Sequence, residues 1–405
     1  MRRSRLALFL VFSAGAIAFA CSSFTAANDG DELPDGGPPT PGTDGTVLDV
    51  DTPPIPDGAP PDREPYDAAL NPPCPAPVAD SISGKTKDLL ASPPTDAVEF
   101  PFQLDSDSLA VFWVAQHITL EEHRDAGIAR SEAYNGKGIA RIRRVRKAAP
   151  SAAETLVEGQ TRTTALVLDG DHVYWAAYEG QSIIRRVRRD CAAPCEPEYV
   201  GNAGGLVHKL YRPRPGLLVL QLEGNRVHLF DLSKPNVGSI EIATTGNFTY
   251  VVPNAGDLLL GASFDEAAVR RHSGPSFSQI DPTWATLPEG GSDSEGPDAL
   301  GTDCESTFAA RKDQSIWRVG NDGGVFTYWL QGEVGPAVAS AVDGRYVYFA
   351  ALDTGGVFAF DKSTGERFVL HRGNVWNLHA DAQGVYWGEH DDRSPEVGKL
   401  YVLWR

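Results

Sequence analysis

Short apolar segments, separated by turn residues, recur along most of this chain. Except in one short stretch near 119–133, their apolar positions do not follow the period of a helix. One kind of segment repeats four times, with a valine followed by aromatic residues: Val111-Phe112-Trp113, Val173-Tyr174-Trp175, Val347-Tyr348-Phe349 and Val385-Tyr386-Trp387. The Asp-Gly pairs at 169–170 and 343–344 precede two of them and are typical of hairpin turns. The pattern predicts antiparallel strands in an all-β fold.

A further strand that carries arginine follows these segments, as at 139–142, 182–185 and 315–318. Tyr174-Trp175 followed by Ile183-Ile184-Arg185 resembles the repeats of YWTD-type and NHL-like β-propellers. The resemblance implies a β-propeller that covers the chain from about residue 85 onward. Ala176-Ala177 stands where that family has Thr-Asp, so the role of that pair is not carried over to this chain.

Weaker copies of the repeat fill the gaps between the clear ones. The segments Leu217–Leu222, Asp257–Ala262 and Ser306–Arg311 fit second strands of three further units. Seven anchor residues result: Trp113, Trp175, Leu220, Leu260, Phe308, Phe349 and Trp387. Apart from a longer interval between the first two, successive anchors lie roughly 40 residues apart, which is the size of a four-stranded blade. We therefore predict seven blades; six blades with one misassigned unit, or an open arrangement, are the alternatives.

The last unit lacks a fourth strand, because its third strand, near 398–404, ends the sequence. An unpaired strand would leave an exposed hydrogen-bonding edge. The segment 86–90 precedes the first unit just as 154–157 precedes the second. We therefore expect 86–90 to complete the seventh blade and close the ring.

The N-terminus has the pattern of a lipoprotein signal peptide. Arg2, Arg3 and Arg5 precede an uncharged apolar run at 6–20, too short to span a membrane comfortably. Ala18-Phe19-Ala20-Cys21 resembles a lipobox, in which Cys21 is lipidated after cleavage of residues 1–20. Ordinary cleavage with an incidental cysteine is the alternative. By resemblance to Gram-negative lipoproteins, Ser22 favours an anchor in the outer membrane.

The segment after the anchor is rich in proline, aspartate and glycine. Residues 28–62 contain nine Pro, eight Asp and six Gly, with no Lys or Arg. Such a composition has too little apolar surface to offset the entropy of ordering. We predict a disordered tether over 21–84 and the propeller domain over 85–405. A calcium-binding acidic tract is the alternative for the tether.

The net charge and the cysteine content indicate which partners and which cellular compartment are compatible with this chain. The net charge of −18 disfavours nucleic acid and anionic lipid surfaces, which are bound through Lys and Arg. We expect a monomer that contacts the membrane through its anchor alone. Cys191 and Cys195 are spaced for a local disulfide, and Cys74 and Cys304 remain as a second candidate pair.

Three long acidic connections fall on one face of the predicted ring, because they join second to third strands or one blade to the next. Long loops on a rigid scaffold commonly bind ligands. We therefore interpret this face as a candidate binding surface for a cation, a glycan or an envelope protein. The residues chosen are Glu121, Glu122, Asp293, Glu295, Asp391 and Asp392.

The sequence carries no catalytic motif of fixed spacing, such as a nucleophile elbow, a zinc helix or a phosphate loop. His117, His123 and His390 lie near carboxylates and could each be half of a metal site, but isolated surface histidines are the commoner explanation. We expect no cofactor. The predicted function is non-enzymatic binding or scaffolding; a propeller hydrolase or lyase with a dispersed, metal-assisted site is the alternative.

Overall fold

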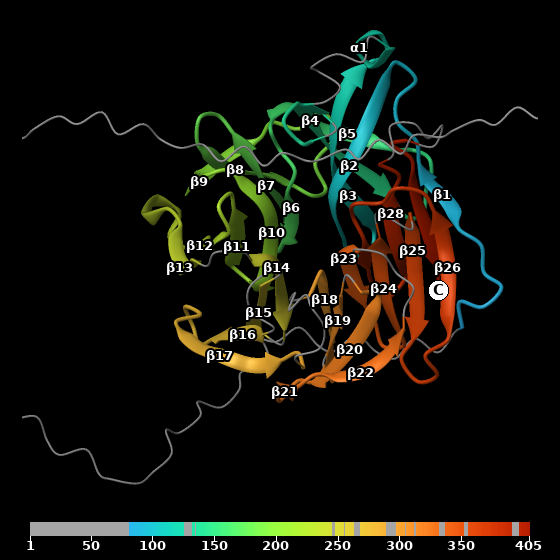
Figure 1. Cartoon of the computed structure of the whole chain (residues 1–405). Coiled ribbons are helices and arrows are strands. Elements are labelled where there is room, and N and C mark those ends of the chain that lie inside the picture. The colour runs from blue at the N-terminus through green and yellow to red at the C-terminus, as the bar shows by residue number, and fades with distance from the viewer. Residues whose placement is uncertain are drawn as a thin grey trace, which may run out of the picture. The chain divides into compact units, whose positions relative to one another are not determined.

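The computed structural model describes residues 81–124, 132–133, 135–244, 248–254, 256–262, 268–288, 297–303, 305–311, 313–331, 337–351, 355–390 and 397–405. These residues form seven blades of four antiparallel strands arranged as a ring, and a short fifth strand extends the sheet of blade 4 (Figure 1). The prediction of a seven-bladed, all-β propeller is therefore confirmed. The short helices are α1 (Leu120–Arg124) and the 3₁₀ turn η1 (Pro235–Val237). Within these ranges, no helix is long and apolar enough to cross a membrane.

Blades 1 to 4 follow one another along the chain, each with its first strand nearest the ring axis. Blade 1 consists of β2 (Ala97–Ser106), β3 (Ala110–Thr119), β4 (Ile139–Arg146) and β5 (Glu154–Thr161). Blade 2 consists of β6 (Leu166–Asp169), β7 (His172–Tyr178), β8 (Ser182–Arg188) and β9 (Glu198–Gly204). Blade 3 consists of β10 (Val207–Arg214), β11 (Leu217–Leu222), β12 (Arg226–Asp231) and β13 (Ile240–Thr244). Blade 4 consists of β14 (Phe248–Asn254), β15 (Asp257–Ala262), β16 (Ala268–Ser273) and β17 (Gln279–Thr286).

Blades 5 to 7 complete the ring. Blade 5 consists of β18 (Ala299–Thr302), β19 (Ser306–Ala310), β20 (Ser315–Gly320) and β22 (Thr327–Gln331). Between its last two strands, β21 (Gly324–Val325) crosses over and pairs in parallel with β17 of blade 4. Blade 6 consists of β23 (Ala337–Val342), β24 (Tyr346–Ala351), β25 (Gly356–Asp361) and β26 (Arg367–Arg372). Blade 7 consists of β27 (His379–Ala380), β28 (Gly384–Gly388), β29 (Leu400–Trp404) and β1 (Asp88–Ala91).

The second strands are apolar on both faces because each blade is packed between two neighbours. In β7, Val173 and Trp175 pack into the core shared with blade 1, whereas Tyr174 packs into the core shared with blade 3. The buried Trp175 indole nitrogen donates a hydrogen bond to Gln160 Oε1 at 3.0 Å. This two-sided burial explains why the valine-aromatic segment is the most conspicuous repeat in the sequence.

The ring is closed as predicted, by a strand from the N-terminal side of the propeller. β1 pairs with β29 in antiparallel register, with Asp88 opposite Val402 and Leu89 opposite Tyr401. Leu90 and Ala91 are fully buried between blades 7 and 1. The first and last strands of the described propeller therefore lie in one sheet.

A recurring ion pair joins successive blades. The residue directly after the third strand of one blade is a cation, and it pairs with an aspartate in the turn between the first and second strands of the preceding blade. We call these pairs latches; they are Arg189–Asp107, Lys362–Asp303, Arg405–Asp343 and Lys147–Asp381. They join blade 2 to 1, 6 to 5, 7 to 6 and 1 to 7.

Each latch aspartate also holds its own turn together. In Asp343, Oδ1 accepts the backbone N–H groups of Arg345 and Tyr346 at 2.6 and 2.7 Å, while Oδ2 accepts the Tyr348 hydroxyl at 2.6 Å. Asp303 binds its turn in the same way, through two N–H groups at 2.7 Å. One carboxylate thus specifies a turn and a blade contact together.

The Arg405–Asp343 latch provides a test of how much these pairs stabilise the ring. Both side chains are buried, with 3% and 2% of their surface exposed. In Arg405→Met, the buried Asp343 carboxylate loses its ion-pair partner. We expect this substitution to lower the free energy of unfolding, measured by urea denaturation, by about 3–5 kcal/mol.

The matched control is Lys234→Met, which removes an exposed ion pair with Asp231 and should cost about 0–1 kcal/mol. The double variant Arg405→Met/Asp343→Asn should recover part of the loss, because a neutral amide needs no counter-charge. Equal losses of stability in Arg405→Met and Lys234→Met would contradict the proposed importance of the latch.

Candidate functional site

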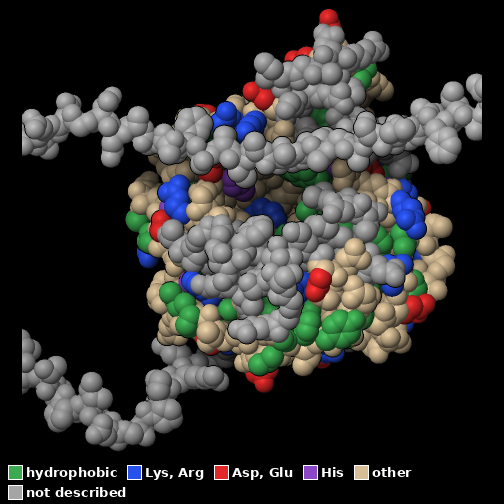
Figure 2. All heavy atoms as spheres, viewed as in Figure 1, with side chains coloured by type: hydrophobic (Ala, Val, Ile, Leu, Met, Phe, Trp, Pro, Cys, Tyr) green, Lys and Arg blue, Asp and Glu red, His purple; other side chains and the backbone are tan. Residues whose placement is uncertain are grey.

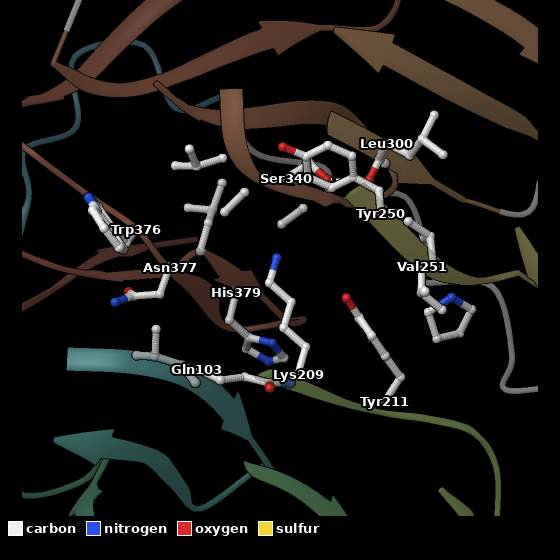
Figure 3. A pocket seen from close by; sticks show the side chains of 18 of the residues that line it. Gln103, Lys209, Tyr211, Tyr250, Val251, Leu300, Ser340, Trp376, Asn377 and His379 are labelled. Carbon is white, nitrogen blue, oxygen red and sulfur yellow. Dashed lines mark hydrogen bonds between the residues drawn. The ribbon is translucent and has the colours of Figure 1, made fainter. Parts of the chain in front are cut away.

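The first strands of the seven blades surround a cavity on the ring axis. Its volume is about 430 Å³, within the usual range for small-molecule sites. Six blades contribute lining residues, and Thr164 adds one from the connection between β5 and β6. The lining includes Phe102, Gln103, Thr164, Lys209, Tyr211, Tyr250, Leu300, Ser340, Trp376 and His379 (Figure 3). In the space-filling view, the middle of one face is hollowed, and basic side chains lie within the hollow (Figure 2).

Lys209 is the cation that extends into this cavity. It lies on β10, where Leu210 is fully buried in the core between blades 2 and 3, while Lys209 and Tyr211 line the cavity. Figure 3 shows its amine pointing toward the middle of the ring of lining side chains. The ammonium lies 5.6 Å from the centre of the Tyr250 ring, a cation–π contact.

Burial lowers the pKa of Lys209, because the cavity wall replaces the water that would solvate an ammonium. No carboxylate among the described residues forms an ion pair with it. A cation that loses solvent without gaining a counter-charge reduces the stability of the folded state. Such an arrangement is more typical of a functional group than of a structural one.

Gln103 fixes the segment that carries Lys209. Its amide nitrogen donates to the carbonyl of Leu210 at 2.5 Å, and its Oε1 accepts the Leu210 N–H at 3.0 Å. This contact reaches from blade 1 to blade 3 past the short strand β6. The Gln103 side chain thus makes the two backbone hydrogen bonds that a neighbouring strand would otherwise make, and it fixes β10 at the cavity wall.

Other polar groups around the cavity already have partners in the protein. The Tyr250 hydroxyl donates to the carbonyl of Ala337 at 2.8 Å, and the Ser340 hydroxyl donates to the carbonyl of Leu300. The Asn377 amide donates to Pro101 O and accepts from Gly388 N–H, both at 2.8 Å. Burial raises the pKa of Tyr250, so this phenol stays neutral.

A serine and a histidine meet at one end of the cavity. Ser106 Oγ lies 2.9 Å from His379 Nε2 and also hydrogen-bonds to Asp381, the latch partner of Lys147. Asp105 lies 3.8 Å from the same nitrogen of His379. A Ser-His catalytic pair needs an acceptor on the other ring nitrogen to orient the base. No described residue accepts a hydrogen bond from the other ring nitrogen of His379, so we interpret the contact as a structural network that joins blades 7 and 1.

The structure describes only part of the predicted acidic face. Glu121 and Glu122 lie exposed on α1, between β3 and β4. The Glu122 carboxylate accepts the N–H and the hydroxyl of Thr119, at 2.8 and 2.9 Å. These hydrogen bonds lower the pKa of Glu122. Because Glu122 N–H in turn donates to Thr119 Oγ1 at 3.2 Å, the two residues form a capping box. Asp293, Glu295, Asp391 and Asp392 lie outside the described residues.

His390 is not the surface residue that the sequence indicated. It is fully buried, and its ring stacks on Trp376 with the centroids 4.5 Å apart. Its Nδ1 lies 3.2 Å from the Pro101 carbonyl oxygen. Aromatic packing around the channel therefore accounts for this histidine. Among the described side chains, no group of three or more His, Cys, Asp or Glu gathers at metal-binding distance.

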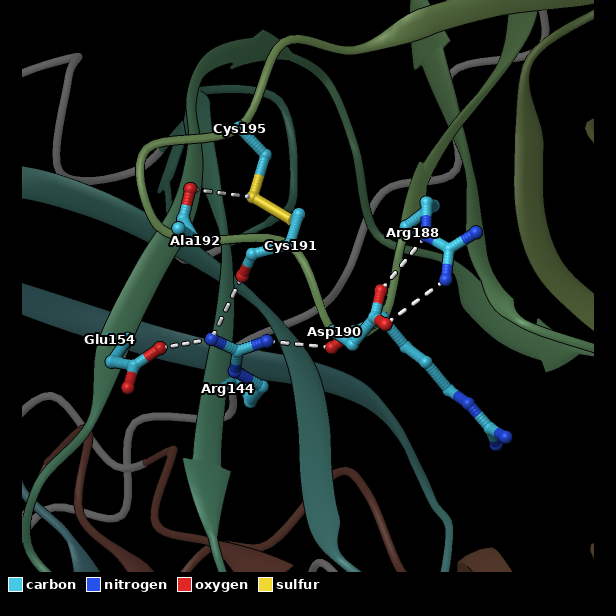
Figure 4. The surroundings of a disulfide bond; sticks show 8 residues. Arg144, Glu154, Arg188, Asp190, Cys191, Ala192 and Cys195 are labelled. Carbon is cyan, nitrogen blue, oxygen red and sulfur yellow. Dashed lines mark hydrogen bonds and ion pairs between the residues drawn. A yellow bond between two sulfur atoms is a disulfide. The ribbon is translucent and has the colours of Figure 1, made fainter.

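Cys191 and Cys195 form a disulfide in the loop between β8 and β9, as predicted (Figure 4). The loop contacts blade 1, because Arg144 donates to the carbonyl of Cys191 at 3.2 Å and Cys195 N–H donates to the carbonyl of Leu156 at 2.7 Å. The disulfide loop is thus part of the contact between blades 1 and 2. Cys21, Cys74 and Cys304 lie outside the described residues.

The cavity and Lys209 were missed by the sequence analysis, which searched the loops for function. The available signal was a single lysine in a first strand, between the apolar residues Val207 and Leu210. Lysine seldom lies in a protein interior without a partner, so its place in the apolar segment before the predicted second strand 217–222 was informative.

Comparison with solved structures shows the fold alone. The chain is similar to the WD40 β-propeller domain of Doa1, at 12% identity and a TM-score of 0.54, over 79% of this chain and 97% of that one. It also matches the computationally designed Ika8 protein, at 13% identity and a TM-score of 0.49, over 80% of this chain and 100% of that one. A nidogen/laminin complex matches at 13% identity and a TM-score of 0.44, over 59% of this chain and 94% of that one. No family model and no curated protein matches the sequence.

The uncompensated charge of Lys209 predicts a gain in stability on its removal. We expect Lys209→Met, which keeps the length of the side chain, to raise the urea midpoint at pH 7. Since the pKa of Lys209 is lower in the folded than in the unfolded chain, the unfolded chain binds more protons between the two values. The stability of the unsubstituted protein should therefore rise with pH in this window, and the gain from Lys209→Met should shrink.

The control is Lys137→Met, at an exposed position, which should leave the midpoint within experimental error at each pH. A loss of stability in Lys209→Met would show that Lys209 stabilises the folded state, which would contradict this prediction.

Proposed function

We propose that this chain is a lipid-anchored protein of the bacterial cell envelope that binds a small molecule in the channel of its propeller without catalysing a reaction. The observation that carries the binding proposal is the axial cavity, into which Lys209 extends without an ion-pair partner among the described residues. Propeller channels bring side chains from every blade to one place, so a ligand there contacts many segments at once. A rigid, pre-formed cavity of this kind is typical of small-molecule sites.

The anchor is supported by the sequence before the propeller. A basic start, a short apolar run and Ala18-Phe19-Ala20-Cys21 have the order of a lipoprotein signal, and an acidic, proline-rich segment follows. We propose that Cys21 carries the lipid, that residues 21–84 form a tether and that the anchor lies in the outer membrane. The acidic loops remain a second proposed contact surface, for an envelope protein, a glycan or a cation.

Lipidation is tested with Cys21→Ala in the full chain, expressed in a Gram-negative host with labelled palmitate. We expect label and membrane association for the unsubstituted protein and neither for Cys21→Ala. The control is Cys74→Ala, which should keep both. Label retained by Cys21→Ala would contradict the assignment of the lipid site.

Channel binding is tested by the thermal stability of the full chain in detergent with a panel of sugars, amino acids and organic acids. A ligand at about 100 times its Kd adds about 2.7 kcal/mol, so at least one class should raise the midpoint by several degrees. Ser340→Trp, which places a bulky ring at the cavity wall, should abolish the shift while keeping the circular dichroism of the fold. A shift that persists in Ser340→Trp, or a panel without any shift, would contradict binding in the channel.

A further inference from the structure

We propose that the channel cavity selects a monocarboxylate with an apolar or aromatic body, whose carboxylate pairs with the ammonium of Lys209. This inference rests on the proposed binding function and adds the chemical class of the ligand. The charge of the cavity, the number of available donors and the apolar wall support it.

The charge balance of the cavity favours an anion. Two carboxylates near the cavity already have partners in the protein: Asp381 pairs with Lys147, and Asp105 accepts the N–H of Leu168 at 2.8 Å. Asp298 lies close enough to Tyr250 to raise the pKa of its phenol, but forms no ion pair with Lys209. The contact that the described residues offer the Lys209 ammonium is the face of the Tyr250 ring, at 5.6 Å. A ligand carboxylate would supply the counter-charge that no described carboxylate supplies, in a partly enclosed cavity where less water competes for it than at the surface.

The number of donors favours a single negative charge. A phosphate offers several oxygens and is usually held by arginines, helix N-termini or several N–H groups together. Here the hydroxyls of Tyr250 and Ser340 and the amide of Asn377 are bound to protein acceptors, and Lys209 supplies a compact point charge. The cavity can therefore neutralise one carboxylate more readily than a polyanion.

The rest of the wall is suited to an apolar body. Side chains without charge line most of it, including Phe102, Leu104, Val251, Leu300, Val338 and Val342. A cavity of about 430 Å³ accommodates a substituted benzene ring or a short branched chain together with its carboxylate. Burying that body supplies the hydrophobic part of the affinity, and the ion pair supplies the selectivity for charge.

Side-chain hydrogen bonds to β10 fix the backbone position of Lys209. Gln103 binds both backbone groups of Leu210, and the Tyr211 hydroxyl lies 3.2 Å from Gln221 Oε1. The two residues that directly follow Lys209 are thus both held by side-chain hydrogen bonds. A fixed base for a flexible side chain lowers the entropy that ion pairing has to overcome.

The test uses fluorine NMR of the full chain with three probes of one shape: 4-(trifluoromethyl)benzoate, the corresponding benzyl alcohol and the corresponding benzylamine. We expect the benzoate to bind about tenfold or more tightly than the alcohol, which corresponds to one ion pair in a poorly solvated site. The amine should not bind. Lys209→Met should reduce benzoate binding to the level of the alcohol, whereas Lys209→Arg should keep the preference for the anion.

Each outcome distinguishes the inference from the function on which it rests. Equal binding of benzoate and alcohol to the unsubstituted protein, or unchanged benzoate binding in Lys209→Met, would overturn the carboxylate assignment and leave a channel that binds another class. Displacement of bound benzoate by inorganic phosphate at similar concentration would overturn the preference for one charge. If no probe binds and the panel of small molecules gives no thermal shift, the binding function itself fails.

Discussion

Ring closure is the constraint on which the rest of this molecule depends. The seventh sheet is complete only because β1, from the N-terminal side of the propeller, pairs with β29 at the other end of the described chain. Without this pairing, blades 7 and 1 would lose the core that Leu90 and Ala91 fill. The seven first strands could then separate, and the cavity between them would open. The candidate site is therefore a property of the closed ring and of no single blade.

The latches show how closure is distributed around the ring. Hydrophobic contact between blades is extensive but non-directional, so it does not by itself fix how one blade is placed on the next. An aspartate that organises its own turn and accepts a cation from the following blade adds a directional contact at four of the junctions. At the junction of blades 4 and 5, the equivalent positions hold Asn254 and Asn321, whose amide groups lie 3.4 Å apart. The same geometry is thus kept there with neutral groups.

The repeat made the architecture predictable. A second strand buried on both faces leaves a run of valine and aromatic residues, so β11 and β15 have the bounds that the sequence predicted, 217–222 and 257–262. Other features depend on contacts between distant residues and left no local pattern. β27 is only two residues long, and the burial of His390 results from rings that lie far away in the sequence. Lys209 was missed for the same reason, because its surroundings come from seven separate segments.

The closing strand also determines when the native state can form during synthesis. Of the described strands, β1 leaves the ribosome first and β29 last, so the two partners of one sheet are made about 300 residues apart. Blades 1 to 6 can assemble beforehand, but they surround an open channel until Trp404 and the latch residue Arg405 have been made. A chain that stops one strand short loses the closing sheet and the blade 7 latch together. Formation of the cavity is thereby coupled to synthesis of β29, and a chain without this strand leaves β1 and β28 with exposed hydrogen-bonding edges.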